Sequence, residues 1–212
     1  MFNYSENTRR NKELKIKELL KLIDADKNIK KEAAQIEKII LSHVLSADTM
    51  NMCTSENVKE IYIIDVLLKE RFIPLDFIKE VDKEINFQTI FRFKCNKDTL
   101  FVLSSKIMEE GKVKMLSTFK TEWMAVEKRD FNFTSNLENI YKQFLEVISS
   151  VKFLSNEDLA DFDKRVIKIK KLQAEIAKHK RIMISEKQPN IKMAINDKIK
   201  KYQKQLEEIT NG

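Results

Sequence analysis

The chain has 212 residues, of which 42% are hydrophobic and 34% charged, with a formal net charge of +7 at pH 7. Its apolar runs are far shorter than the ~20 residues that cross a bilayer, and no apolar stretch follows the N-terminal charges, so we expect a cytoplasmic protein without a secretory signal. Its only glycines are Gly111 and Gly212, which excludes the glycine-rich loops that hold nucleotide phosphates.

The N-terminal segments favour helices. Residues 12–23 place four leucine and isoleucine side chains near one helical face, and the polar residues after Ile23 end that helix. Residues 29–35 have helical composition, whereas residues 36–45 fit a helix or a strand equally well. The polar segment 46–57 is typical of turns.

Residues 58–69, with the sequence VKEIYIIDVLLK, predict a central strand. Apolar side chains fall on both sides of the extended chain, as in a strand that is covered on both faces. One residue interrupts this pattern, because Asp65 lies in the middle of the run.

The following segments complete an α+β domain over residues 1–153. After Pro74, residues 75–85 carry the apolar stripe of a helix. We predict a hairpin for residues 89–95 and 99–105, a further strand within residues 112–124, and an amphipathic helix over residues 136–150. The predicted fold is therefore a small mixed β-sheet covered by helices.

Residues 154–212 predict a separate basic helical hairpin or coiled coil. Apolar residues recur there at steps of three and four, with an interruption around Pro189. Because this strip is narrow, we expect it to mediate association into a homo-oligomer or hetero-oligomer. The seam residues are Val166, Ile169, Ile176, Ile195, Ile199 and Leu206.

The excess positive charge is confined to this C-terminal region. Residues 164–204 contain 14 lysines and arginines but only three acids. Such a surface neutralises phosphates without reading sequence, although a solvated face or a dock for an acidic protein fits it too. The candidate nucleic-acid-binding residues are Lys168, Lys170, Lys171, Lys178, Lys180, Arg181, Lys192, Lys198, Lys200, Lys201 and Lys204.

Several motifs in this order resemble one bacterial family of unknown function. They are LSADTMNM, VKEIYIIDVLLK, the pair QTIFRFKC and DTLFVLSSK, FKTEW, and the C-terminal SEKQPNIKMAINDKIKKYQKQLEEI. Asp65 departs from the glutamate usual in that family, and Pro189 from its phenylalanine. Genes of the family often neighbour helicases and type III restriction-type methyltransferases, so the resemblance implies a role beside such a partner in DNA-directed defence.

Asp65 also permits a catalytic interpretation. With Glu60 or Glu70 it would hold Mg²⁺ in a divergent metal-dependent nuclease. However, the later strands carry no acid-x-Lys motif, so we favour a structural carboxylate paired with a lysine or capping a backbone group.

The remaining chemistry-bearing side chains have structural interpretations. We expect Trp123 and the three sheet phenylalanines 91, 93 and 101 in the core, and His179 on a solvated basic face. Two histidines and two separated cysteines predict no metal site, and no cofactor is expected.

The function expected from the sequence is that of a non-catalytic accessory or adaptor protein. It would bind nucleic acid non-specifically, a helicase or nuclease partner, or both, through its basic C-terminal helices. The metal-dependent nuclease is the alternative.

Overall fold

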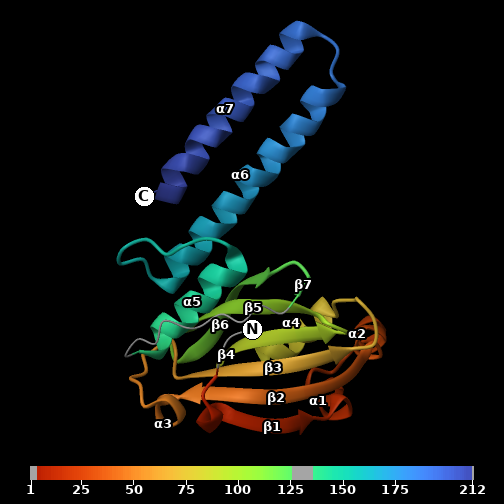
Figure 1. Ribbon diagram of the computed structural model, residues 1–212, viewed down its shortest axis with the longest axis vertical. Coiled ribbons are helices and arrows are strands. Elements are labelled where there is room, and N and C mark those ends of the chain that lie inside the picture. Colours follow the sequence, from red (N-terminus) through yellow and green to blue (C-terminus); the bar gives the residue numbers. More distant parts are fainter. Residues whose placement is uncertain (1–3, 126–135, 212) are drawn as a thin grey trace. The chain divides into compact units, whose positions relative to one another are not determined.

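A computed structural model describes residues 4–125 and 136–211 (Figure 1). The chain divides into two compact units, Met1–Ser150 and Val151–Gly212. The first unit is a mixed β-sheet with helices and the second is a helical hairpin, which confirms the predicted α+β class. The boundary expected from the sequence, between residues 153 and 154, lies close to the division between these units.

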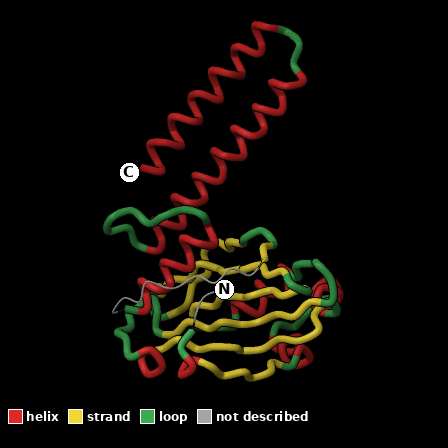
Figure 2. Tube along the Cα trace, in the orientation of Figure 1, coloured by secondary structure: helices red, strands yellow, loops and turns green. Residues whose placement is uncertain are grey.

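The first unit is built on one mixed sheet (Figure 2). Its strands follow one another in space in the order β1-β2-β3-β4-β5-β6, and β7 also pairs with β5. Only the β3–β4 pair among these is parallel, because helix α4 carries the chain back between the two strands. The strands are β1 Arg9–Leu14, β2 Ile36–Ser46, β3 Glu60–Leu68, β4 Gln88–Cys95, β5 Asp98–Glu109, β6 Lys112–Lys120 and β7 Met124–Ala125.

Helices cover both faces of the central strands. One face packs against α1, α2 and α4, while α5 contacts β3, β5 and β6. A short 3-10 helix precedes β1, and α3 follows β2. The bounds are Glu6–Thr8 for the 3-10 helix, then α1 Ile16–Leu22, α2 Lys27–Ala33, α3 Ala47–Met50, α4 Leu75–Lys83 and α5 Leu137–Ser149.

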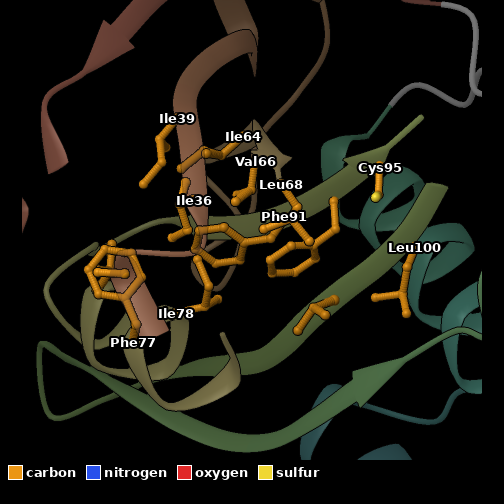
Figure 3. Close-up of a cluster of buried hydrophobic side chains, with 14 residues drawn as sticks. Ile36, Ile39, Ile64, Val66, Leu68, Phe77, Ile78, Phe91, Cys95 and Leu100 are labelled. Carbon is orange, nitrogen blue, oxygen red and sulfur yellow. The ribbon is translucent and has the colours of Figure 1, made fainter. Parts of the chain in front are cut away.

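The core confirms the prediction of a doubly covered central strand. Ile64 and Val66 of β3 belong to the apolar cluster that includes Phe77 of α4 and Phe91 of β4 (Figure 3). Ile63, which points to the opposite face, is fully buried as well. Burying each such side chain stabilises the fold by about 1.5–3 kcal/mol.

The aromatic residues expected in the core are buried or packed against it. Phe91, Phe93 and Phe101 are all buried within the sheet. Trp123 is partly buried and packs against the same cluster as Phe91. The aromatic face of the sheet is therefore closed to a stacked base.

A two-residue turn between β5 and β6 explains one glycine. Glu110 and Gly111 both have positive φ, at 52° and 76°. This is the backbone geometry of a type I′ hairpin turn, which favours glycine because it has no Cβ.

The N-terminal segments differ from the sequence prediction. Residues 12–23 do not form one helix, because Arg9–Leu14 pair with β2 as an edge strand and the helix begins only at Ile16. Leu14 and Leu19 still pack on the same core. The apolar pattern therefore identified core-facing residues correctly, although the single helix predicted from it was wrong. Residues 36–45, which the sequence left open, form most of β2 because β1 and β3 pair with it on both sides.

The second unit is an antiparallel pair of helices, α6 Leu159–Ser185 and α7 Pro189–Asn211. Ile176, Ile195 and Ile199 form its small core, with Tyr202 and Leu206 packed around them. Val166 and Ile169 are also buried. A single chain therefore covers these seam side chains, and association through them stays a prediction.

His179 lies in this seam rather than on a solvated basic face. Its ring is 14% exposed, and its Nδ1 atom lies 2.8 Å from the carbonyl oxygen of Glu175. The ring meets the edge of Tyr202 at a centroid distance of 5.5 Å. The expectation for His179 was wrong, because the flanking lysines point outward while the ring turns toward α7.

We expect residues 1–155 to fold without the hairpin. The core cluster around Phe77 and Phe91 draws only on residues before the hairpin, so truncation removes none of its members. Circular dichroism and light scattering should show a soluble monodisperse protein with a cooperative melt. An aggregated or non-cooperative product would show that the hairpin completes this core.

Candidate functional site

Asp65 forms a buried ion-pair cluster between the two parallel strands. The register of β3 and β4 places Asp65 beside Arg92, whose Nε and Nη2 atoms donate to the carboxylate at 2.5 and 2.8 Å. Lys94 donates to the same carboxylate at 2.7 Å. The side chains of Asp65 and Arg92 are only 9% and 3% exposed. This arrangement makes Asp65 an anchor for two cations.

Side chains from the N-terminal segment and β2 complete the surroundings of this cluster. The Tyr4 and His43 rings meet at a tilt of 30° with their centroids 4.4 Å apart, and the Arg92 guanidinium lies 5.8 Å from the Tyr4 ring centroid. The Oγ1 atom of Thr8 lies 3.0 Å from Nδ1 of His43. Burial, with Arg92 adding to it, lowers the pKa of His43, so its imidazole is neutral at pH 7.

The pKa of Asp65 reflects a balance of burial and pairing. Burial alone would raise it, but the hydrogen bonds and charge of Arg92, followed by Lys94 and Ser42, hold the pKa below its usual value. The carboxylate therefore stays ionised in the folded protein and serves the ion pair. This is the structural role that the sequence favoured.

The three acids of the nuclease alternative are not brought together. Glu60 begins β3 and Glu70 lies beyond its end, each five residues from Asp65, which is about 16 Å along a strand. Five residues also turn the Glu60 side chain to the opposite face from that of Asp65. Across residues 4–125 and 136–211, no three His, Cys, Asp or Glu side chains gather closely enough to hold a metal ion.

We expect Asp65→Asn to lower the free energy of unfolding at pH 7 by about 3–5 kcal/mol, because it leaves Arg92 buried without its counter-charge. Because the folded pKa of Asp65 is lowered, this stabilisation is present above the unfolded pKa of about 3.9 and is lost as pH falls through the folded pKa. Urea unfolding from pH 7 down to pH 3 should show the difference between wild type and variant shrinking below about pH 4.

Asp98→Asn is the matched control for Asp65→Asn. Asp98 pairs with Arg71, which is 60% exposed, so its loss should cost at most about 1 kcal/mol. Equal effects of the two substitutions would contradict a special role for the buried cluster.

A second buried ion pair, Asp82–Lys106, ties helix α4 to the sheet. The Lys106 Nζ atom lies 2.6 Å from the Asp82 carboxylate, and neither side chain is more than 1% exposed. The same ammonium donates to the carbonyl oxygens of Asp82, Ile85 and Phe87 at 2.8–2.9 Å. Burial lowers the pKa of Lys106 and raises that of Asp82, and each charge opposes the shift of the other. Lys106 thus satisfies carbonyls at the end of α4, where a cation also suits the helix dipole.

We expect Lys106→Met to lower the free energy of unfolding by about 3–5 kcal/mol, since it leaves a buried carboxyl and three carbonyls without their donor. Chemical denaturation measures this difference, with the exposed Lys97→Met as control. An effect below about 1 kcal/mol would contradict the anchoring role of Lys106.

The basic residues of the hairpin are arranged as the sequence predicted for a solvent-facing surface. All eleven candidate nucleic-acid-binding side chains lie on α6 or α7 and are exposed. The apolar seam between the helices is buried, so the charged side chains cover the outside of a narrow rod-like pair.

The two helices differ in how their basic residues are balanced. Residues 159–185 hold eight lysines and arginines and three acids, Asp161, Asp163 and Glu175. Residues 189–211 hold five lysines and three acids, Asp197, Glu207 and Glu208, at helical spacings from the lysines. Helix α6 therefore carries most of the uncompensated charge.

Four exposed basic residues lie along one side of α6. Lys171 and Lys178 are seven residues apart, which is two turns and about 10.5 Å along the helix. Arg181 follows Lys178 by three residues and Lys168 precedes Lys171 by three, so the four side chains share one side of α6.

One protein-family model matches most of the chain. A family model described as "Domain of unknown function (DUF4391)" matches residues 2–206. The chain belongs to this family. The match covers both units, so the hairpin is part of the family pattern together with the sheet. No curated protein and no solved structure matches the chain.

The structure explains one of the motifs that resembled the family. In LSADTMNM, Ser46 caps α3 by accepting from the Thr49 amide at 3.3 Å, and Thr49 accepts from the Ser46 amide at 2.9 Å. This reciprocal capping box fixes the end of β2. The motif is therefore a folding signal at this position.

Sequence reasoning missed the partners of the buried acids. Arg92 and Lys94 lie on the same side of TIFRFKC, and these two charges together with the one acid of VKEIYIIDVLLK were the available signal for pairing across β3 and β4. Lys106 gave no such signal, because it follows an apolar strand as any exposed lysine would.

Among the described helices, none is long and apolar enough to span a bilayer.

Proposed function

We propose that this protein is a non-catalytic accessory protein that binds nucleic acid without sequence preference through its C-terminal hairpin. The observation that carries the proposal is the exposure of all eleven basic candidates on α6 and α7, with their apolar seam turned inward. The proposal assigns no catalytic activity to the first unit.

Charge density favours a polyanion over a merely solvated face. Exposed helices usually mix signs through pairs of Glu and Lys four residues apart. On α6 eight basic residues stand against three acids, and beyond the Lys164–Asp161 and Arg165–Glu157 pairs at its start the acids are scarce, whereas residues 1–163 as a whole contain more acids than bases. Phosphates supply the missing counter-charges, and counterion release supplies the driving force.

The setting of this binding is a DNA-directed bacterial defence system. This part of the proposal rests on the family resemblance, since genes of that family neighbour helicases and type III restriction-type methyltransferases. We infer that the protein works in the cytoplasm beside a helicase, methyltransferase or nuclease partner and holds nucleic acid near it.

We expect binding to duplex DNA to weaken linearly as the logarithm of salt concentration rises. Four to six phosphate contacts would give a slope of roughly −4 to −5, from about −0.9 per phosphate neutralised. Fluorescence anisotropy with two unrelated duplex sequences should give the same affinity and slope for both. The absence of binding to duplex and single strands at low salt would refute the proposed function.

Two matched charge reversals locate the contacts. The α6 set changes Lys168, Lys171, Lys178 and Arg181 to Glu, and the α7 set changes Lys198, Lys200, Lys201 and Lys204 to Glu. Both sets alter exposed residues and the same number of charges. We expect the α6 set to weaken binding and flatten the salt slope more than the α7 set, with the melting temperature of the first unit unchanged. A stronger effect of the α7 set would contradict the assignment to α6.

A further inference from the structure

The closed end of the hairpin exposes apolar side chains on both sides of the connection between α6 and α7. Ile184 and Met193 are 81% and 70% exposed, and Ile182 and Ile191 are 42% and 41% exposed. Ile182 and Ile184 lie in the last turn of α6, and Ile191 and Met193 in the first two turns of α7, on either side of the connection that Figure 1 shows between the two helices. Scattered single exposures are ordinary, but four apolar side chains around one connection are typical of a contact surface.

Positive charge surrounds these side chains. Residues 178–192 include the five basic residues Lys178, Lys180, Arg181, Lys187 and Lys192, and one acid, Glu186. The Oε1 atom of Glu186 accepts from the backbone amides of Lys187 and Gln188 at 2.7 and 2.9 Å, and these bonds lower its pKa. The Glu186 carboxylate is thus hydrogen-bonded to the backbone of the connection between α6 and α7. The five basic residues around the connection therefore have few acidic neighbours.

The end of the hairpin is held firmly by the seam behind it. Met183, between the exposed Ile182 and Ile184, packs against the cluster of Ile176 and Ile195. The Ser185 hydroxyl donates to the Ile182 carbonyl oxygen at 3.0 Å, which fastens the last turn of α6. The exposed side chains are therefore presented on ordered backbone.

We propose that this end of the hairpin is a wedge that binds junctions between duplex and single-stranded nucleic acid. Ile184 and Met193 lie against the face of the last base pair, and the surrounding lysines and arginine contact the phosphates of the diverging strands. This proposal rests on the proposed function, and it adds the structure of the nucleic acid that the hairpin recognises.

The combination of groups favours nucleic acid over a protein or lipid surface. Five cations among fifteen residues match a dense row of phosphates. The apolar side chains require an apolar surface within that polyanion, and a base-pair face becomes accessible only where the stack ends. Aliphatic side chains are known to insert between base steps, with basic residues on the neighbouring backbone. The tryptophan or tyrosine anchors typical of a membrane interface are absent from residues 178–193.

The test compares forked DNA with a blunt duplex of the same sequence, each carrying 2-aminopurine at the position of the junction. We expect the full-length protein to bind the fork about tenfold more tightly, from burial of Ile and Met side chains, and to raise 2-aminopurine fluorescence as the base unstacks. Ile184→Ser with Met193→Ser should remove both effects while leaving duplex affinity and its salt slope unchanged.

Two control variants separate the wedge from the charged face. Ile184→Leu with Met193→Leu keeps apolar side chains and should keep the preference for the fork. The α6 charge reversal should weaken binding to fork and duplex together.

The other outcomes are distinguishable. Equal binding of fork and duplex with unchanged fluorescence overturns the wedge and leaves the proposed function standing. Loss of all nucleic-acid binding in the wild type overturns both. A lower mass by light scattering for the serine variant, with fork preference retained, would assign the apolar end to a protein contact and overturn the wedge.

Discussion

The pairing of Asp65 with Arg92 constrains the centre of the sheet. A parallel pair of strands has no tight turn to fix its register, and here the chain returns through α4 before β4 begins. A slip of one residue would turn Arg92 to the face opposite Asp65 and leave two buried charges unpaired. The apolar side chains of β3 and β4 tolerate either face, because both faces are covered, so the ion pair specifies the register that hydrophobicity leaves open.

The buried ion pairs of the sheet unit and the exposed lysines of the hairpin have different roles. In the sheet unit, Asp65–Arg92 and Asp82–Lys106 are withdrawn from water and join neighbouring elements. In the hairpin, the lysines remain in water, where they contribute little to stability and are available to a ligand. Mutations in the first group should therefore lower the stability of the fold, whereas mutations in the second should leave it nearly unchanged.

The parts of the fold that the sequence predicted depend on local periodicity. The central strand, α4 and the two helices of the hairpin each carry an apolar pattern that is typical of one kind of secondary structure. Arg9–Leu14 has no such pattern, because an exposed edge strand owes its conformation to pairing with β2. The charged candidates were predictable because exposure follows from the seam, whereas the partners of Asp65 and the burial of Lys106 depend on register between distant segments.

Pro189 has a consequence for the topology of the hairpin. It occupies the first position of α7, where its missing amide costs nothing, and it disfavours helical backbone at Gln188. Helices α6 and α7 thus cannot merge into one uninterrupted helix of about fifty residues, which would carry α7 away from its own α6 and into a second chain. A single imino acid at the connection thus favours two separate helices over one continuous helix.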